Sequence, residues 1–195
     1  MKKVIVVSKT HLDLGFTDLA ETVRQKYIND FIPAAVQAAA ALNTGDQKRF
    51  VWTTGSWILK EALESGTPEN RAALRKALQA GDIAPHALPF TLHTELLDTD
   101  TLRYGLSLVD ELDALRGRKT LAAKMTDVPG HTRALVPMLA EKGIRLLHIG
   151  VNGASALPKV PPCFLWQVDG AEVVVIYSGD YGGAYQNDLV EDVLY

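Results

Sequence analysis

Residues 121–131, Leu-Ala-Ala-Lys-Met-Thr-Asp-Val-Pro-Gly-His, decide the fold because they place a polar cluster directly after an apolar strand. A second stretch repeats this arrangement near the N-terminus, where His11-Leu12-Asp13 follows the apolar run Val4 to Val7. Parallel strands end at one edge of a sheet, and α/β folds place their functional sites there. One His and two Asp at such an edge form a mixed nitrogen and oxygen ligand set that suits Zn²⁺. The two stretches together predict a metal-dependent hydrolase.

Around these stretches, β-branched runs alternate with helical periodicity, which is typical of a parallel sheet wrapped by helices. The predicted strands cover about residues 3–7, 49–53, 83–88, 121–125, 145–149 and 172–177. The predicted helices cover about residues 18–42, 56–64, 67–80, 99–115 and 133–142, and a further helix begins near residue 187. We therefore expect an α/β fold with a parallel sheet of about six strands. Either an open doubly wound sheet or a β/α barrel cut short of closure fits this order.

Two of the predicted helices carry start signals. Asp18-x-x-Glu21 resembles a capping box, in which two side chains bond the free amides of the first turn. Thr67-Pro68 supplies an N-cap residue followed by proline at the first helical position, and Gly81 ends the same helix. No internal repeat, low-complexity tract or interdomain linker is evident. We therefore expect one catalytic-type domain over residues 1–195, the N-terminal fragment of a longer protein.

Composition excludes several classes of function. The chain has 195 residues, 47% of them hydrophobic and 22% charged, and a net charge of −3, which is ordinary for a soluble globular chain. Basic residues are scattered rather than gathered in a stripe, so we expect no nucleic-acid partner. No apolar run approaches the roughly 20 residues that a bilayer crossing needs, so we expect no membrane partner. The single Cys163 and the lack of a signal-peptide core predict a cytoplasmic protein.

Each polar cluster also has a purely structural interpretation. His11 and Asp13 could cap a helix and bond loop amides, as an isolated His-x-Asp most often does. The second cluster is harder to explain in this way. A turn would use Asp127, Pro129 and Gly130, but it has no need of His131. The presence of both clusters in one chain favours a functional site.

The residues resemble the N-terminal domain of glycoside hydrolase family 38, the retaining α-mannosidases, and more closely an uncharacterised bacterial branch related to them. The family's H-x-D after the first strand is similar to His11 and Asp13, and its D-x-x-G-H is similar to Asp127 to His131, with Leu135-Val136-Pro137 beyond it. A third similarity to the family covers two stretches of this sequence. They are residues 164–170, which are rich in aromatic side chains and end in Asp-Gly, and residues 179–182. Order and spacing agree over most of the chain.

The resemblance implies a seven-stranded β/α barrel of the glycoside hydrolase and deacetylase type, incomplete in this chain. It implies one Zn²⁺ ion bound by His11, Asp13 and Asp127, with Asp127 also the catalytic nucleophile and Asp180 the catalytic acid/base. The family's fourth ligand, a His far beyond the second cluster, has no counterpart here, which implies a truncated segment that is inactive by itself. Phe16 stands near the place where better-known members have a Trp beneath the sugar.

Five residues are candidates for binding a carbohydrate substrate. His93 and Glu95 follow the third predicted strand, and His131 belongs to the second polar cluster. Phe16 and Tyr181 supply aromatic rings, and an aromatic ring can stack on a sugar. The sequence decides neither the sugar nor the oligomeric state.

The proposed catalytic roles also have a physical basis. Cleavage that retains the configuration of the anomeric carbon needs two carboxyl groups about 5–5.5 Å apart. One is ionised and attacks the anomeric carbon, and the other is protonated and assists departure of the leaving group. A metal would keep Asp127 ionised. Asp180 follows an apolar strand, which would help it to hold a proton. Two other functions stay open: a metal-dependent polysaccharide deacetylase or amidohydrolase-like enzyme, and an inactive carbohydrate-binding module.

Overall fold

The computed structural model describes residues 7–45, 48–128, 130–152 and 154–178. They form an α/β fold with mostly parallel strands, arranged in one sheet of three strands and one of four. The described part of the chain contains no closed barrel. The chain divides into two compact units. Unit 1 comprises Met1–Phe90 and Ser107–Thr120, and unit 2 comprises Thr91–Leu106 and Leu121–Tyr195. Whether they act as one catalytic domain stays a prediction.

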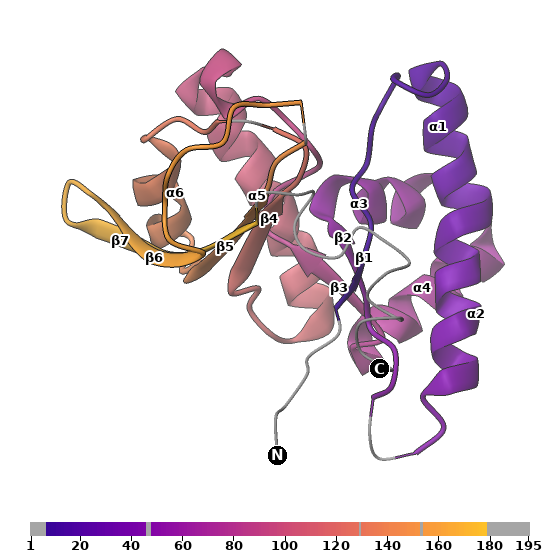
Figure 1. Cartoon of the computed structure of the whole chain (residues 1–195). Helices are drawn as coiled ribbons and strands as arrows, with labels where there is room; N and C mark the ends of the chain where they lie inside the picture. Colours follow the sequence, from indigo (N-terminus) through magenta and orange to yellow (C-terminus); the bar gives the residue numbers. More distant parts are fainter. Residues whose placement is uncertain (1–6, 46–47, 129, 153, 179–195) are drawn as a thin grey trace, which may run out of the picture. The chain divides into compact units, whose positions relative to one another are not determined.

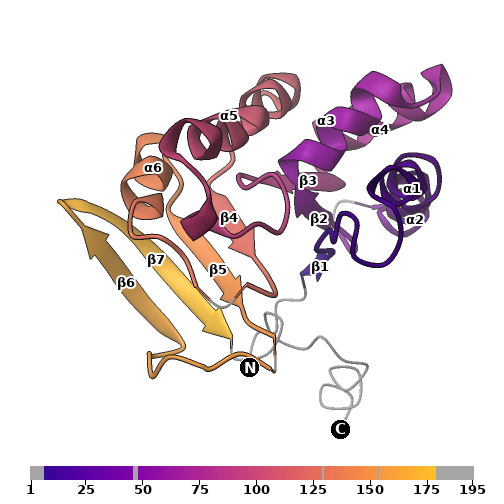
Figure 2. The same ribbon diagram turned by 90° about the horizontal axis from the view of Figure 1, so that it is seen from above.

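The sheet of unit 1 has three parallel strands in the order β1-β2-β3. They are β1 (Ser8–Lys9), β2 (Trp52–Gly55) and β3 (Ile83–His86). Helices lie around this small sheet, as Figure 2 shows for α1 to α4. The strands predicted at 49–53 and 83–88 overlap β2 and β3. The first predicted strand lies almost entirely outside the described residues, and β1 begins just after it.

The predicted helix at 18–42 forms as one long helix with a widened turn in its middle (Figure 1). It comprises α1 (Ala20–Lys26), the π-helical turn η1 (Tyr27–Phe31) and α2 (Ile32–Leu42). Pro33 explains the widened turn, because proline has no amide hydrogen and its ring crowds the preceding turn of an α-helix. The Ile32 amide accordingly donates to the Tyr27 carbonyl, five residues back.

The capping signals have mixed outcomes. The predicted capping box at Asp18 is wrong: α1 has Leu19 as its N-cap and no side-chain cap, and Asp18 accepts from the adjacent Leu19 amide instead. The other signals are confirmed. After α3 (Ser56–Ser65), the Thr67 hydroxyl accepts from the Asn70 amide at 3.2 Å and begins α4 (Pro68–Ala80). Gly81 ends α4 in the left-handed conformation that glycine readily adopts, with φ 81°.

The core of unit 1 joins the buried sides of its helices to the sheet. Its members are buried apolar side chains from the strands, the long helix, α3, α4 and the later part of α5 (Thr99–Arg116). They include Leu12, Val23, Ile28, Ile32, Ile58, Leu59, Leu74, Leu78, Ile83 and Leu112. Burial of this kind contributes about 25 cal/mol per Å² of apolar surface. The core therefore holds firmly the loop that carries Leu12.

The sheet of unit 2 has four strands in the order β4-β5-β7-β6. They are β4 (Ala122–Met125), β5 (Leu146–Gly150), β6 (Cys163–Val168) and β7 (Ala171–Ser178). The strands β4, β5 and β7 are parallel. Helix α6 (Leu135–Glu141) packs on one face of the sheet, against β6 and β7 (Figure 2). The strands predicted at 121–125, 145–149 and 172–177 and the helix predicted at 133–142 are thus found.

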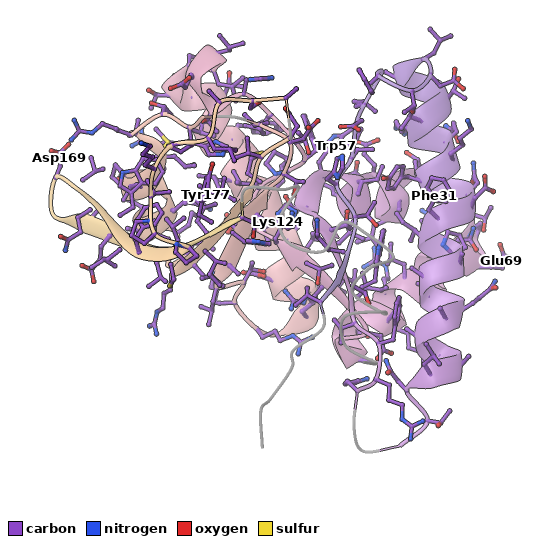
Figure 3. The ribbon with its side chains drawn as sticks, viewed as in Figure 1. Phe31, Trp57, Glu69, Lys124, Asp169 and Tyr177 are labelled. Atoms are coloured by element: carbon purple, nitrogen blue, oxygen red, sulfur yellow. The ribbon has the colours of Figure 1, made fainter. Side chains whose placement is uncertain are left out.

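Strand β6 is an addition to the six predicted strands. It runs antiparallel to β7, with Val168 opposite Ala171. Asp169 and Gly170 form the two-residue turn between them, with φ 51° and 83°, and Asp169 lies at the tip of the hairpin (Figure 3). Positive φ at both positions matches a type I′ turn, for which Asp-Gly is a favoured sequence.

The segment between the two sheets in sequence contains a short helix and the start of a long one. The 3₁₀ turn η2 (Thr94–Leu96) belongs to unit 2, as do the first residues of α5. The Asp98 carboxylate accepts from the Thr101 amide at 2.7 Å and so caps α5. This hydrogen bond from the Thr101 amide is the largest cause of a lowered pKa at Asp98. Within the described ranges, no helix is long and apolar enough to cross a membrane.

Candidate metal centre

Among the described residues, His11, Asp13 and Asp127 are the candidates for holding a metal ion. Each is half-buried. His11 and Asp13 belong to unit 1 and Asp127 belongs to unit 2. Asp180, the expected acid/base, lies outside the described residues.

His11 and Asp13 lie side by side after β1. The distance from His11 Nε2 to Asp13 Oδ2 is 3.3 Å. Zn–N and Zn–O bonds of about 2.0–2.2 Å in a tetrahedral site place two ligand atoms about 3.4 Å apart. The two side chains therefore already have the separation of two adjacent ligands, and one is nitrogen and the other oxygen. This pair fits a zinc ion or a similar divalent cation.

The residue between them explains this geometry. Leu12 is 3% exposed and belongs to the core of unit 1. In an extended segment, neighbouring side chains point to opposite sides, so a buried Leu12 places His11 and Asp13 together on the other side. The segment is fixed on its N-terminal side as well, because the Trp52 indole donates to the Thr10 hydroxyl at 2.8 Å.

Tyr27 supports the same segment from the widened turn η1. Its buried phenol donates to the His11 carbonyl oxygen at 3.2 Å. Burial, with a smaller contribution from the charge of Asp13, raises the pKa of Tyr27 to about 12. The phenol therefore keeps its proton at physiological pH and remains a donor. The sequence analysis did not identify Tyr27, because helical spacing marks it only as a core residue.

Asp127 is held by its backbone. It follows β4 and has φ 75°, the left-handed region that non-glycine residues rarely adopt. Its amide donates to the Gly150 carbonyl at 2.9 Å, and its own carbonyl accepts from the Asn152 side-chain amide at 2.8 Å. Both partners follow or end β5. Such strain costs about 1–3 kcal/mol and is common at functional sites.

Asn152 is a second residue that the sequence analysis missed. While its amide group donates to Asp127, its Oδ1 accepts from the Ala154 amide at 3.1 Å and from the Ser155 hydroxyl at 2.9 Å. The side chain therefore joins the loop after β5 to the loop after β4. Asn152 lies three residues after the end of the strand predicted at 145–149, and Asn side chains readily bond loop backbone, but this signal does not identify Asp127 as the partner.

Three of the expected substrate-binding residues come together within unit 2. His131 Nδ1 lies 3.3 Å from the hydroxyl of Thr94, which separates His93 from Glu95 in the chain. The Glu95 carboxylate lies beside Gly130, with its Oε2 3.7 Å from the position that a Cβ at residue 130 would take. Burial, and then the nearby charge of His93, lowers the pKa of His131 to about 4. His93 and Glu95 themselves are exposed.

The remaining expected substrate-binding residues are aromatic. Phe16, in unit 1, is 86% exposed, so its ring packs against little of the protein. Tyr181 lies beyond the last described residue. A role in sugar stacking stays a prediction for both.

The α/β fold is glycoside hydrolase-like by structure. One similar solved structure is an alpha-mannosidase from Enterococcus faecalis V583, with a TM-score of 0.69 and 16% identity over 88% of this chain. A protein in the glycosyl hydrolase family 38 from Enterococcus faecalis matches with a TM-score of 0.65 and 14% identity over 96% of this chain. A 4-alpha-glucanotransferase from Thermococcus litoralis matches with a TM-score of 0.59 and 12% identity over 98%.

These similarities concern the fold alone, given the low identities. This chain spans 19%, 20% and 28% of the lengths of the alpha-mannosidase, the family 38 protein and the glucanotransferase, respectively. No family model matches the sequence, and no curated protein matches it.

Proposed function

We propose that this chain is the metal-binding N-terminal part of a retaining glycoside hydrolase of the α-mannosidase type. In this proposal His11, Asp13 and Asp127 hold one Zn²⁺ ion. The observation that carries it is the His11–Asp13 pair, which has the separation of two tetrahedral ligands and follows a strand of a glycoside hydrolase-like fold. The substrate would be a carbohydrate with an α-mannoside linkage.

The proposal requires Asp127 of unit 2 to join the pair in unit 1. One observation on Asp127 itself supports a functional role. Asp127 keeps a strained backbone conformation that two hydrogen bonds hold in place, as expected of a residue with a fixed functional direction.

The protein's own residues would divide the chemistry as follows. A bound zinc ion would supply positive charge that keeps the nearby carboxylates ionised and attracts sugar hydroxyls. The Asp127 carboxylate would attack the anomeric carbon and form a covalent bond to the sugar. Asp180 would give a proton to the departing oxygen and then take one from the water that displaces Asp127 from the anomeric carbon and frees the sugar. Phe16 and Tyr181 would contact the sugar ring, and His93, Glu95 and His131 would bind its hydroxyls.

Zinc binding by this chain tests the metal site. We expect one equivalent to bind in calorimetric titration, and the substitutions His11→Asn and Asp127→Asn each to weaken it at least tenfold, about 1.4 kcal/mol. Asp30→Asn is the matched control, since it removes one exposed carboxylate from η1 and should change the affinity less than twofold. Unchanged binding by Asp127→Asn would exclude Asp127 as a ligand.

Activity of the protein that contains this chain tests the reaction. We expect hydrolysis of p-nitrophenyl α-mannoside that a chelator abolishes and zinc restores, with retention at the anomeric carbon in the first product seen by proton NMR. Release of acetate from acetylated sugars without glycoside cleavage would favour the deacetylase alternative. Sugar binding without either reaction would favour the inactive binding module.

A further inference from the structure

His131 and Thr94 form a hydrogen-bonded pair within unit 2. Thr94 begins η2 and is 1% exposed. Its Oγ1 accepts from the Thr132 amide at 3.0 Å and also lies 3.3 Å from His131 Nδ1. The buried Thr94 hydroxyl thus contacts the ring of His131 and the backbone amide of Thr132, the next residue.

These contacts bear on where the imidazole carries its proton. Among the hydrogen bonds of the described residues, Thr94 Oγ1 accepts from the Thr132 amide, which leaves its hydroxyl hydrogen available for donation to His131 Nδ1. A neutral imidazole has one donor and one acceptor nitrogen. When Nδ1 accepts from Thr94, Nε2 carries the proton. Donation from Thr94 would therefore hold the His131 ring as the Nε2–H tautomer.

The donor on the other side of this ring has no partner. His131 Nε2 is buried and makes no hydrogen bond within the described ranges. A buried donor without an acceptor costs about 1–3 kcal/mol. A ligand oxygen that reached Nε2 would remove this cost, so its hydrogen bond would contribute more to binding than an ordinary exposed one.

The charge of the ring decides what kind of oxygen fits. Burial and the nearby His93 keep His131 neutral at physiological pH, with a pKa of about 4. The Glu95 carboxylate lies beside Gly130, the residue that precedes His131. A neutral donor beside a carboxylate suits an uncharged hydroxyl and disfavours a phosphate or carboxylate ligand.

We propose that Thr94 acts as a positioning residue that holds His131 as a neutral Nε2–H donor to a hydroxyl group of the sugar substrate. This inference rests on the proposed function, because it names a contact for the same substrate. Since Nε2 is buried, the residues that cover it must part when the sugar binds.

The tautomer is tested on the full chain without metal or sugar. Two-bond nitrogen–proton NMR spectra should show His131 as the Nε2–H form from pH 5.5 to 8. Thr94→Val, which removes the hydroxyl and keeps the shape, should give a mixture of tautomers. Thr94→Ser keeps the hydroxyl and should resemble the wild type. A fixed Nδ1–H form in the wild type would overturn the inference and leave the proposed function standing.

Sugar binding tests the role of the donor. The probe is methyl α-D-mannopyranoside, titrated into the zinc-loaded full chain. We expect His131→Ala to weaken binding about tenfold, as expected for one hydrogen bond of about 1.4 kcal/mol. Thr94→Val should weaken it several-fold, and Thr94→Ser less than twofold. Equal binding by wild type and His131→Ala would overturn the inference, as would a wild-type chain that binds zinc and no mannoside. The proposed function is judged separately, by zinc stoichiometry and hydrolysis.

Discussion

The segments around His11 and Asp127 present candidate ligands by two different physical means. In unit 1, a buried side chain between the two candidate ligands sets their direction, a phenol donates to the His11 backbone carbonyl, and an indole donates to the Thr10 hydroxyl. In unit 2, hydrogen bonds to the backbone of Asp127 hold a conformation that is intrinsically unfavourable. The difference teaches that a ligand can be fixed by core packing, which stabilises the fold, or by backbone strain, which other contacts must offset.

The largest effect should come from removing the side-chain anchor in unit 1. Leu12→Ala leaves a cavity in the core and should lower the free energy of unfolding by about 2–5 kcal/mol. Urea denaturation of the full chain measures it. Leu14→Ala, in the same segment but 37% exposed, should change stability by less than about 0.5 kcal/mol. Similar losses for both would show that core packing does not anchor this segment.

Acid should affect unit 2 through His131. The folded pKa, about 4, is below the ordinary histidine value of 6.5, so the stability that this group contributes is fully present above pH 6.5 and is lost as the pH falls towards 4. The expected loss between pH 7 and pH 4.5 is about 2 kcal/mol. Denaturation at these two pH values measures it. His131→Asn should remove most of this pH dependence, whereas His93→Gln should keep most of it, because burial is the larger cause of the shift.

Removing the Asn152 side chain should have a smaller effect. Asn152→Ala leaves the Asp127 carbonyl without its donor and the Ala154 amide and Ser155 hydroxyl without this acceptor, and should cost about 1–2 kcal/mol of stability. If the proposed zinc site is correct, zinc affinity should also fall about tenfold or more, as for other residues that orient a ligand. Asn29→Ala on the exposed face of η1 is the control. Unchanged zinc affinity in Asn152→Ala would mean that this bond does not position the carboxylate.

Relieving the strain at residue 127 should have the smallest effect, and of opposite sign. Asp127→Gly should raise stability by up to about 1 kcal/mol, because glycine adopts φ 75° without steric cost. Asp127→Asn should leave stability nearly unchanged, since Asn also tolerates this region. Calorimetric melting of the two variants compares them. A less stable Asp127→Gly would show that the carboxylate itself contributes to folding.

Local sequence signals predicted most of the elements but not how the strands are shared between sheets. Alternation of β-branched runs and helical periodicity located β2, β3, β4, β5 and β7, and Thr67 and Gly81 marked the ends of α4. The capping box at Asp18 failed, because the helix begins two residues later. Strand β6 was missed because it follows a proline-rich connection and alternates only weakly between exposed and half-buried side chains.

The candidate ligands were predictable, and the residues that support them were not. His11, Asp13 and Asp127 stand directly after apolar strands, a local signal. Tyr27 and Asn152 act on backbone atoms that are 16 and 25 residues away in the chain, and no local pattern encodes such contacts. The Thr94 contact with His131 likewise spans 37 residues. Long-range hydrogen bonds of this kind become visible only once the chain is folded.

The widened turn before Pro33 has a consequence for how this protein can change through evolution. Each residue of an α-helix turns the chain by about 100°, so one residue gained or lost in a helix swings everything on one side of it around the axis. The turn η1 absorbs such an extra residue just where Tyr27 faces the His11 backbone. Deleting the exposed Asn29 would therefore point the Tyr27 phenol away from His11 without altering either residue. A change of length in this part of the chain would therefore matter even where every remaining residue keeps its identity.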